Sequence, residues 1–185
     1  IRNCLVGSEM CIRDSTIVSR RVNIVGNPAV VSVGMIEAGT RNNIIPEEAM
    51  MMGTIRTFDP DLRKEIYNDI LKIAEGVETA TGAKVEVEFD VGGFYPVTYN
   101  NIPLGERMKQ SLIEATNGNF AEITRRTGAE DFSYFSQEIP GLYIFLGVND
   151  PGVLEQPGNH SPYFTVNDDA LDEGLKSLVY MTIDY

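Results

Sequence analysis

The chain has 185 residues, of which 43% are hydrophobic, 9% aromatic and 23% charged, a composition typical of one large folded domain or two small ones. Its 15 basic and 27 acidic residues give a net charge of -12, which argues against binding to nucleic acid or to an anionic membrane surface. It has one histidine, His160, and two cysteines, which argues against a self-contained catalytic zinc site, a zinc finger or a two-histidine acid–base pair.

The first 15 residues are expected to be a non-native leader that takes no part in the fold. They show no hydrophobic periodicity that continues into the following residues, and they resemble a translated read-through of a sequencing adaptor. No apolar stretch reaches the roughly 18 residues of a membrane span, and no basic region precedes an apolar run as in a secretion signal. The expected location is therefore a reducing cytoplasm, with no membrane partner.

Residues 16–98 are expected to begin with a helix end and two strands. Thr16–Arg21 is typical of a helix end, because its two closing arginines favour the negative end of the helix dipole. Val30–Glu37 and Ala49–Phe58 show the alternation of strands. One face of the first strand should carry Val31, Val33 and Met35, and one face of the second should carry Met50, Met52 and Thr54.

A long amphipathic helix is predicted next. Asp59 and Pro60 are a typical N-cap and first helical residue, and Gly82 should end the helix. Its apolar stripe recurs at spacings of three and four residues, at Leu62, Ile66, Ile70, Ile73 and Val77. Lys84–Val91 then alternates charged and apolar residues and predicts a third strand. This order is the back part of a split β-α-β repeat, an α+β domain with helices on one face of its sheet.

A hinge-like stretch from Gly92 to Asn101 predicts a domain boundary, placed after residue 98. Within residues 99–185, the pattern predicts a helix over Pro103–Thr116, a short strand around Ile123–Arg125, and a strand buried on both faces over Leu142–Val148. A polar loop that carries His160 leads to a closing helix. The apolar stripe of that helix is Leu171, Leu175, Leu178, Val179 and Thr182. This part is predicted to be α/β, with too few strands for a complete sheet.

Four places could carry chemistry, and each also has an ordinary structural explanation. His160 follows a predicted buried strand, where α/β folds place functional residues, yet it could equally be an exposed loop residue. The turn at Gly128–Asp131 offers backbone N–H groups to an anion, or it simply begins a helix. Arg56 either faces solvent or pairs with a carboxylate. Asn43 either serves a ligand or caps a loop.

Five sequence blocks together resemble one family. In chain order they are "GTRNNIIPEEA", "GTIRTFDPDLR", "TGAEDFSYF", "GLYIFLGV" and "NHSPYF". They look like the successive signature blocks of the dinuclear metallo-amidohydrolases, which include aminoacylases, hippurate hydrolases and the hydrolases of indole-acetyl amino acid conjugates. Five blocks in the same order make a far more specific signal than any single glycine motif.

The resemblance implies an α/β metallopeptidase catalytic domain with a smaller ferredoxin-like lid, which usually also forms the homodimer. Residues 16–98 are similar to most of the lid, without its first strand and most of its first helix, and residues 99–185 to the last part of the catalytic domain. By resemblance His160 is a metal ligand. Asn43 and Arg56 would contact the substrate near its scissile amide or its carboxylate. Gly128, Ala129 and Glu130 would lie beside the substrate pocket.

The family's other metal ligands and its catalytic glutamate belong to the part that would precede these residues. The intact enzyme would use two divalent metal ions (Zn, Mn or Co) to hydrolyse an N-acyl amino acid or a related amide. One imidazole cannot hold a metal at useful affinity, so this chain is expected to be inactive, with no catalytic residue of its own. As a fragment, it should also expose apolar surface around Leu142–Val148.

A non-catalytic reading of the same residues remains open. The ferredoxin-like half could be a dimerisation module or a small-ligand-binding module, and this would account for the missing ligands without a truncated enzyme. A His/Asp pair, adjacent glutamates and further histidines in the reading frame before Thr16 would favour the enzyme, whereas a true start codon just before Thr16 would favour the module.

Overall fold

The computed structural model describes residues 2–153 and 155–185, with side chains from Val6 onward. It divides into two compact units. The first comprises the residues up to Val97 together with Thr127–Ala129, and the second comprises Thr98–Arg126 and Glu130–Tyr185. None of the helices in these described residues is long and apolar enough to cross a membrane. The assignment of residues 16–98 as a lid and 99–185 as part of a catalytic domain stays a prediction.

The first unit opens with a 20-residue helix, α1 (Arg2–Arg21). It ends at Arg21 as predicted, and the Arg21 guanidinium lies 3.0 Å from the Asp69 carboxylate. The helix starts much earlier than expected, and Met10, Asp14 and Ile17 are buried. This differs from the expectation that the first 15 residues stand apart from the fold. The reason is their spacing of four and three residues, which places all three side chains on one helical face. That these residues are a non-native leader stays a prediction.

Strands β1 (Ala29–Ala38) and β2 (Ala49–Thr57) form a two-stranded antiparallel sheet. The pairing Val33↔Gly53 is followed by Met35↔Met52, so Gly34 is an extra residue, a β-bulge. Because neighbouring residues of a strand face opposite sides, the bulge moves Met35 to the side away from Val33. The predicted common face for these two residues is therefore wrong. The predicted common face for Met50, Met52 and Thr54 is consistent with the pairing.

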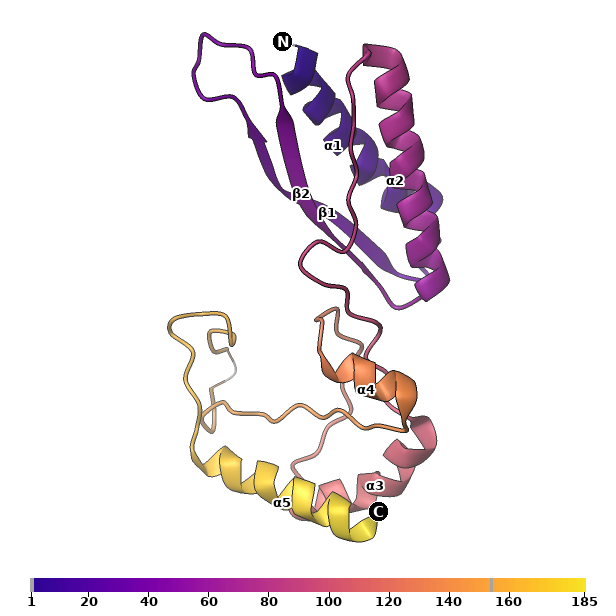
Figure 1. The fold of residues 1–185 in the computed structure, drawn as a ribbon. Coiled ribbons are helices and arrows are strands. Elements are labelled where there is room, and N and C mark those ends of the chain that lie inside the picture. Colours follow the sequence, from indigo (N-terminus) through magenta and orange to yellow (C-terminus); the bar gives the residue numbers. More distant parts are fainter. Residues whose placement is uncertain (1, 154) are drawn as a thin grey trace. The chain divides into compact units, whose positions relative to one another are not determined.

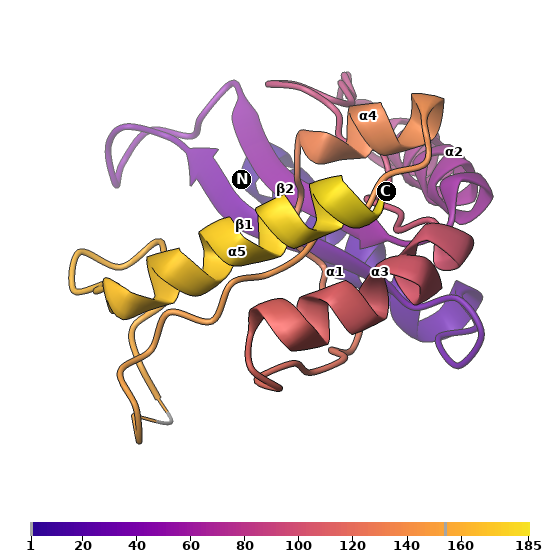
Figure 2. The same ribbon diagram turned by 90° about the horizontal axis from the view of Figure 1, so that it is seen from below.

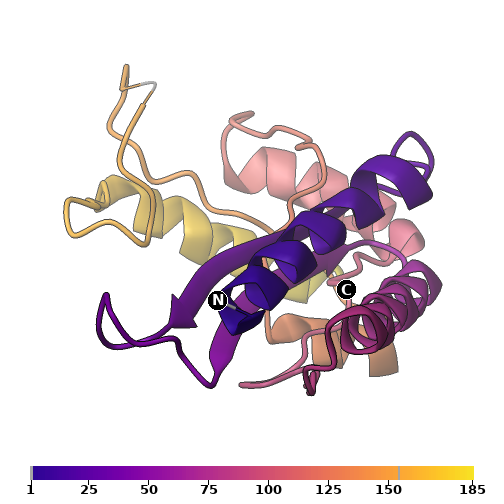
Figure 3. The ribbon, with the colours of Figure 1, turned by 90° about the horizontal axis from the view of Figure 1, so that it is seen from above.

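Both α1 and α2 (Pro60–Thr81) lie on the same side of this sheet (Figures 1 and 3). The predicted limits of α2 are confirmed. Asp59 accepts hydrogen bonds from the backbone N–H groups of Asp61 and Leu62, and Gly82 takes a left-handed φ of 69° at the C-cap. The core of the unit lies between the helices and the sheet, and its buried members include Met10, Ile17, Ala29, Leu62, Ile66, Ile73, Ala74 and Val77.

The segment over residues 84–91 follows α2 but is not a strand, so the predicted third strand is wrong. Its alternation of half-buried and exposed residues is present, and Val85 and Val87 pack against the core. This segment is held in place by side chains of α2 rather than by the backbone hydrogen bonds of a neighbouring strand. Glu78 accepts from the Val85 N–H at 2.7 Å, and Tyr67 donates to Asp90 at 2.6 Å. Tyr67 also stacks on Phe89 with a centroid separation of 4.0 Å.

The second unit contains α3 (Ile102–Ala115), α4 (Phe132–Glu138) and α5 (Asp169–Asp184). Helices α3 and α5 pack side by side (Figure 2). The predicted helix at 103–116 is confirmed within one residue, and the Asn101 side chain caps it by accepting from the Leu104 N–H at 3.0 Å. Helix α5 occupies the position predicted for the closing helix.

Two strands predicted for this unit, at 123–125 and 142–148, are absent from the residues that the structure describes. The apolar run at 142–148 has no regular secondary structure and is not buried on both faces, since Phe145 is 59% exposed. A strand needs a continuous series of backbone hydrogen bonds to a neighbouring strand, and the described hydrogen bonds of this segment are isolated. Asn101 donates to the Gly141 carbonyl at 2.9 Å, and Asn167 donates to the Val148 carbonyl at 2.9 Å. The expectation of exposed apolar surface here is met by Phe145 and Leu146.

The fold class is therefore mixed helix and sheet, with two helices on one face of an antiparallel hairpin in the first unit and a helical second unit. The described residues do not complete a ferredoxin-like domain, and that finer assignment stays a prediction.

Candidate functional site

Arg56 lies on the sheet face away from the helices. It pairs with Val30 across the ladder, whereas their neighbours Val31 and Ile55 pack against the core. Its side chain is exposed, and its Nη1 donates to the Thr127 carbonyl oxygen at 2.6 Å. The guanidinium has five N–H donors, so this bond leaves others for a planar acceptor such as a carboxylate. Within the first unit, the structure thus places Arg56 against the residue that precedes Gly128 and Ala129.

The predicted turn at Gly128–Asp131 has no regular secondary structure as far as Glu130, and α4 begins at Phe132. The Asp131 side chain makes no capping hydrogen bond, while the Glu130 and Asp131 carbonyls accept from Ser133 and Tyr134 at 3.1 Å. Helix α4 has only seven residues, so its N-terminus provides little dipole for an anion. These two carbonyl groups therefore make the first hydrogen bonds at the start of α4. This agrees with the structural explanation for the turn, a helix start, rather than with an anion site.

Glu130 forms a hydrogen bond with the Tyr143 side chain. Burial, this bond and the charges of Glu130 and Asp131 raise the pKa of Tyr143 above its usual value. Two contacts fix the tyrosine. Its ring lies 5.4 Å from the ring of Phe132 and 5.3 Å from that of Phe145.

The backbone of Tyr143 is held equally firmly by Asn100. The Asn100 side chain accepts from the Tyr143 N–H at 2.7 Å and donates to the Tyr143 carbonyl at 2.9 Å. One amide side chain thus makes both bonds that a neighbouring strand would make. Neither Tyr143 nor Asn100 was singled out from the sequence. The available signals were the tyrosine inside the "GLYIFLGV" block and the paired asparagines just before a helix.

Asn43 lies in the loop between β1 and β2, in a turn where the Ile44 N–H donates to the Arg41 carbonyl at 3.4 Å. The loop is at one end of the hairpin, and Arg56 is at the other (Figure 1). Arg56 lies seven residues after Ala49 along β2, which corresponds to about 24 Å. The structure therefore does not bring Asn43 and Arg56 together in one chain.

His160 lies in a tight turn of the second unit, where the Ser161 N–H donates to the Gly158 carbonyl at 2.8 Å. The imidazole is exposed. Among the residues that the structure describes, no group of three or more His, Cys, Asp or Glu side chains could hold a metal ion. The donor set present here therefore does not fit a metal centre by itself, because a bound metal needs about three protein ligands.

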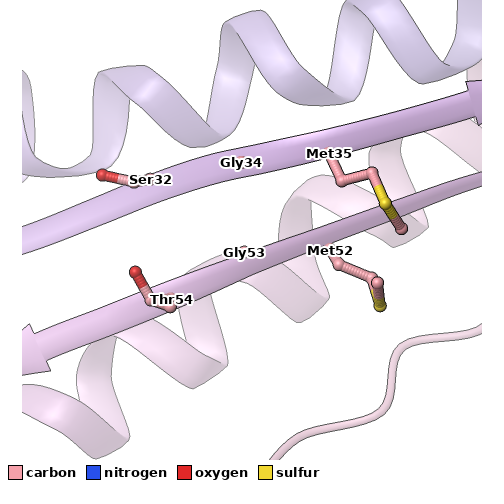
Figure 4. Close-up of a pocket in the computed structure, with 6 residues that line it drawn as sticks. All are labelled: Ser32, Gly34, Met35, Met52, Gly53 and Thr54. Atoms are coloured by element: carbon pink, nitrogen blue, oxygen red, sulfur yellow. The ribbon is translucent and has the colours of Figure 1, made fainter. Parts of the chain in front are cut away.

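A shallow hollow lies on the uncovered face of the hairpin, beside the bulge (Figure 4). Its lining residues are Ser32, Gly34, Met35, Met52, Gly53 and Thr54. The figure shows Met35 and Met52 on adjacent strands, with the helices behind them. Met50 and Met52 are about half exposed. The face that carries Arg56 is thus otherwise apolar near its centre.

Residues 7–184 match the family described as peptidase family M20/M25/M40. The chain is 33% identical over 174 residues to the N-acetyldiaminopimelate deacetylase of Leuconostoc mesenteroides, covering 94% of this chain and 44% of that protein. It is 34% identical over 173 residues to thermostable carboxypeptidase 2 of Saccharolobus solfataricus, covering 91% and 42%. The chain therefore spans less than half the length of these relatives.

Two solved structures share the fold at 24% sequence identity. One, from methicillin-resistant Staphylococcus aureus, superposes with a TM-score of 0.82 over 99% of this chain and 46% of that protein. The other is the YXEP protein of Bacillus subtilis, a dinuclear metal-binding peptidase, with a TM-score of 0.73 over 98% of this chain and 46% of that protein. Both support the mixed helix and sheet architecture described above.

Proposed function

Because the chain belongs to peptidase family M20/M25/M40, we propose that it is part of a metal-dependent hydrolase that cleaves the amide bond of an N-acyl amino acid or a related amide. The observation that carries this proposal is Arg56. It stands on the open sheet face, its "GTIR" block resembles a substrate-contacting block, and its Nη1 is anchored on the carbonyl oxygen of Thr127. The two relatives' names, a deacetylase of an N-acetylated amine and a carboxypeptidase, denote hydrolases of such bonds.

In this proposal Arg56 holds the substrate carboxylate by its planar fork. Asn43 donates a hydrogen bond to the oxyanion that develops on the scissile carbonyl. Gly128 and Ala129 would lie beside the substrate pocket, next to the Thr127 anchor of Arg56. Glu130, which forms a hydrogen bond with Tyr143, would lie there too. A small substrate cannot span the hairpin from Arg56 to Asn43, so the two residues would serve different copies of the site. A homodimer formed through residues 16–98 would meet that requirement.

His160 would supply one ligand to a pair of divalent metal ions (Zn, Mn or Co), which when bound would activate a water molecule for attack on the amide. The other metal ligands and the catalytic glutamate would have to come from polypeptide outside these 185 residues. The chain by itself would then be inactive. A cytoplasmic location stays part of the prediction.

A chimeric enzyme tests this proposal. The chain would replace the segment that it matches in the Leuconostoc mesenteroides deacetylase, and hydrolysis of N-acyl amino acids would be measured with Mn²⁺, Zn²⁺ and Co²⁺. We expect metal-dependent hydrolysis from the chimera and none from the chain alone. Arg56→Gln should raise KM for the carboxylate-bearing substrate at least tenfold and leave the KM for its carboxamide analogue unchanged.

The matched control is Arg20→Gln, because Arg20 is an exposed arginine of the same unit at the end of α1. It should leave both KM values unchanged. A folded chimera that binds N-acyl amino acids but never hydrolyses them, with any of the three metals, would contradict the enzyme and favour the ligand-binding module.

A further inference from the structure

The open face of the hairpin changes in chemistry along its length. The residues of β2 that alternate with Met51 and Ile55 face away from the helices, because those two side chains pack against the core. The cross-strand pairs on this open face follow one another as Arg56↔Val30, Thr54↔Ser32 and Met52↔Met35. A guanidinium group at one end is therefore followed by two hydroxyl groups and then by two thioethers.

The two thioethers border the shallow hollow beside the β-bulge (Figure 4). The hollow is open because Gly34 and Gly53, which also line it, carry no side chains. Its volume of about 250 Å³ is below that of a site for a whole drug-sized ligand and suits a single apolar group. Methionine side chains are flexible and polarizable, so they adapt well to an apolar chain that lies on them. The hollow therefore has the size and the chemistry of a subsite for an apolar tail.

Arg56 sets the distance at which such a tail would lie, because its bond to the Thr127 carbonyl anchors its guanidinium group. Met52 lies four residues before Arg56 along β2, which corresponds to about 14 Å, and Thr54 lies halfway. In an extended N-acyl amino acid, the last acyl carbon lies about 5 Å from the carboxylate carbon for an acetyl group and about 13 Å for an octanoyl group. An acetyl group would thus end before Thr54, whereas an octanoyl chain would reach the methionines.

We propose that this hollow is a subsite for an apolar acyl chain of about eight carbons, on a ligand whose carboxylate pairs with Arg56. The proposal rests on the function proposed above, in which Arg56 holds the substrate carboxylate, and it adds the chemical class of the acyl group. The hydroxyl groups of Ser32 and Thr54 lie between the two ends of the ligand and can donate hydrogen bonds to its amide. The substrate class is then a medium-chain N-acyl amino acid.

Ligand binding to the full 185-residue chain tests this subsite without any need for activity or metal. Kd would be measured by NMR titration for N-acetylglycine, N-octanoylglycine and N-octanoylglycinamide, which has the tail but no carboxylate. We expect N-octanoylglycine to bind roughly thirtyfold more tightly than N-acetylglycine, because six more methylene groups leave water. It should bind about tenfold more tightly than N-octanoylglycinamide, because the amide cannot pair with Arg56.

Methyl-labelled methionine locates the bound tail. N-octanoylglycine should shift the methyl signals of Met35 and Met52, and it should leave the signals of the buried Met10 and Met108 unchanged. The double variant Met35→Thr/Met52→Thr should reduce the affinity for N-octanoylglycine to that for N-acetylglycine. The matched control is Met50→Thr, since Met50 is an exposed methionine of the same strand, two residues beyond the reach of the octanoyl chain. It should leave the affinity unchanged.

Equal Kd values for the two N-acyl glycines, or an octanoyl preference that survives the double variant, would overturn the subsite. Absence of methyl shifts at Met35 and Met52 in the unchanged chain would also overturn it, and this result does not depend on the folding of any variant. A chimera that hydrolyses N-acetyl and N-octanoyl substrates with equal KM would overturn the subsite alone. Tail-dependent binding at the hollow, with no hydrolysis by the chimera, would support the subsite and contradict only the hydrolase.

Discussion

Gly53 lies opposite Val33 at the point where the bulge begins, and the backbone approaches it closely. A Cβ atom at Gly53 would lie 2.4 Å from the Ser32 carbonyl oxygen, a distance that no side chain tolerates. Gly34, the bulged residue itself, has no atom within 4 Å of the corresponding position. The position of Gly53 therefore has no room for a side chain, whereas the position of Gly34 has room for one.

We predict that Gly53→Ala lowers the free energy of unfolding by about 2 kcal/mol, because the strands must separate or shift register. Chemical denaturation of both variants measures this. Gly34→Ala, the control, should change the free energy by less than about 0.5 kcal/mol. Equal losses at the two positions would contradict the close approach at Gly53.

Asp14 is a buried acid without full hydrogen bonding. The residue is 6% exposed, and its Oδ1 has no hydrogen-bond partner in the described structure. Burial raises the pKa of Asp14 from 3.8 to about 6. An acid with a raised pKa favours folding while it is protonated. That contribution is fully present below pH 3.8 and is lost as the pH rises through about 6.

We therefore predict that Asp14→Asn stabilises the protein at pH 7 by about 1–2 kcal/mol, after allowance for partial solvation of the carboxylate. Melting temperatures measured from pH 4 to pH 8 should show the gain above pH 6 and its loss towards pH 4. Glu9→Gln, a change at a half-buried residue of the same helix that weakens the pair with Arg13, should show no such profile. A pH-independent gain would contradict the buried charge.

At the scale of elements, the N-cap residue of α2, Asp59, has two structural functions. Oδ1 of Asp59 accepts from the Asp61 and Leu62 N–H groups at 2.8 and 3.1 Å, and Oδ2 accepts from the Asn27 side chain at 2.8 Å. The same carboxylate therefore starts the helix and holds the turn before β1.

Asp59→Ala should cost about 2 kcal/mol, the upper end for an N-cap, because it removes both functions. Thermal or urea denaturation measures the loss. Asp61→Asn removes only an exposed pair with Lys64 and should cost less than about 0.5 kcal/mol. If Asn27→Ala lowered stability as much as Asp59→Ala, the turn rather than the helix cap would be the main contribution.

The elements also show how far sequence reasoning reaches. The limits of α2 were predictable because Asp59, Pro60 and Gly82 act through local backbone geometry. The orientation of Met35 was not, because nothing in the residues around Gly34 reveals a one-residue insertion relative to a distant strand. The period of α5 was predictable, but the side it buries depends on residues far away in sequence: Ser111 of α3 donates to Asp184 at 2.6 Å, and Leu146 lies against Gly174.

The same distinction applies to the candidate site. The sequence blocks pointed to Arg56, and the structure adds its anchor at Thr127, which is 71 residues away. The strand expected at 142–148 failed because its pattern specifies apolar side chains but not a hydrogen-bonding neighbour. The Asn100 side chain makes the hydrogen bonds that a neighbouring strand would make. The hydrophobic periodicity of the sequence cannot predict such a contact.

At the scale of the whole molecule, large exposed apolar side chains occur in both units. We predict that the folded chain binds a neutral hydrophobic dye at pH 7, because the apolar side chains Leu171, Leu175 and Leu178 of α5 are exposed. Leu175→Ser/Leu178→Ser should remove a large share of the fluorescence, and Leu71→Ser only a small share. A folded chain that gives no dye fluorescence would contradict the exposure of these side chains.

The bulge that turns Met35 outward has a chemical consequence. Met35, Met50 and Met52 gather their thioethers on the open sheet face, whereas Met10 and Met108 are shielded in the cores. Mild peroxide would convert the outward sulfurs to sulfoxides first, adding polar oxygens to the sheet face that also carries Arg56 and leaving the interior unchanged. Oxidation of the protein would therefore make this sheet face more polar while the buried cores stay apolar.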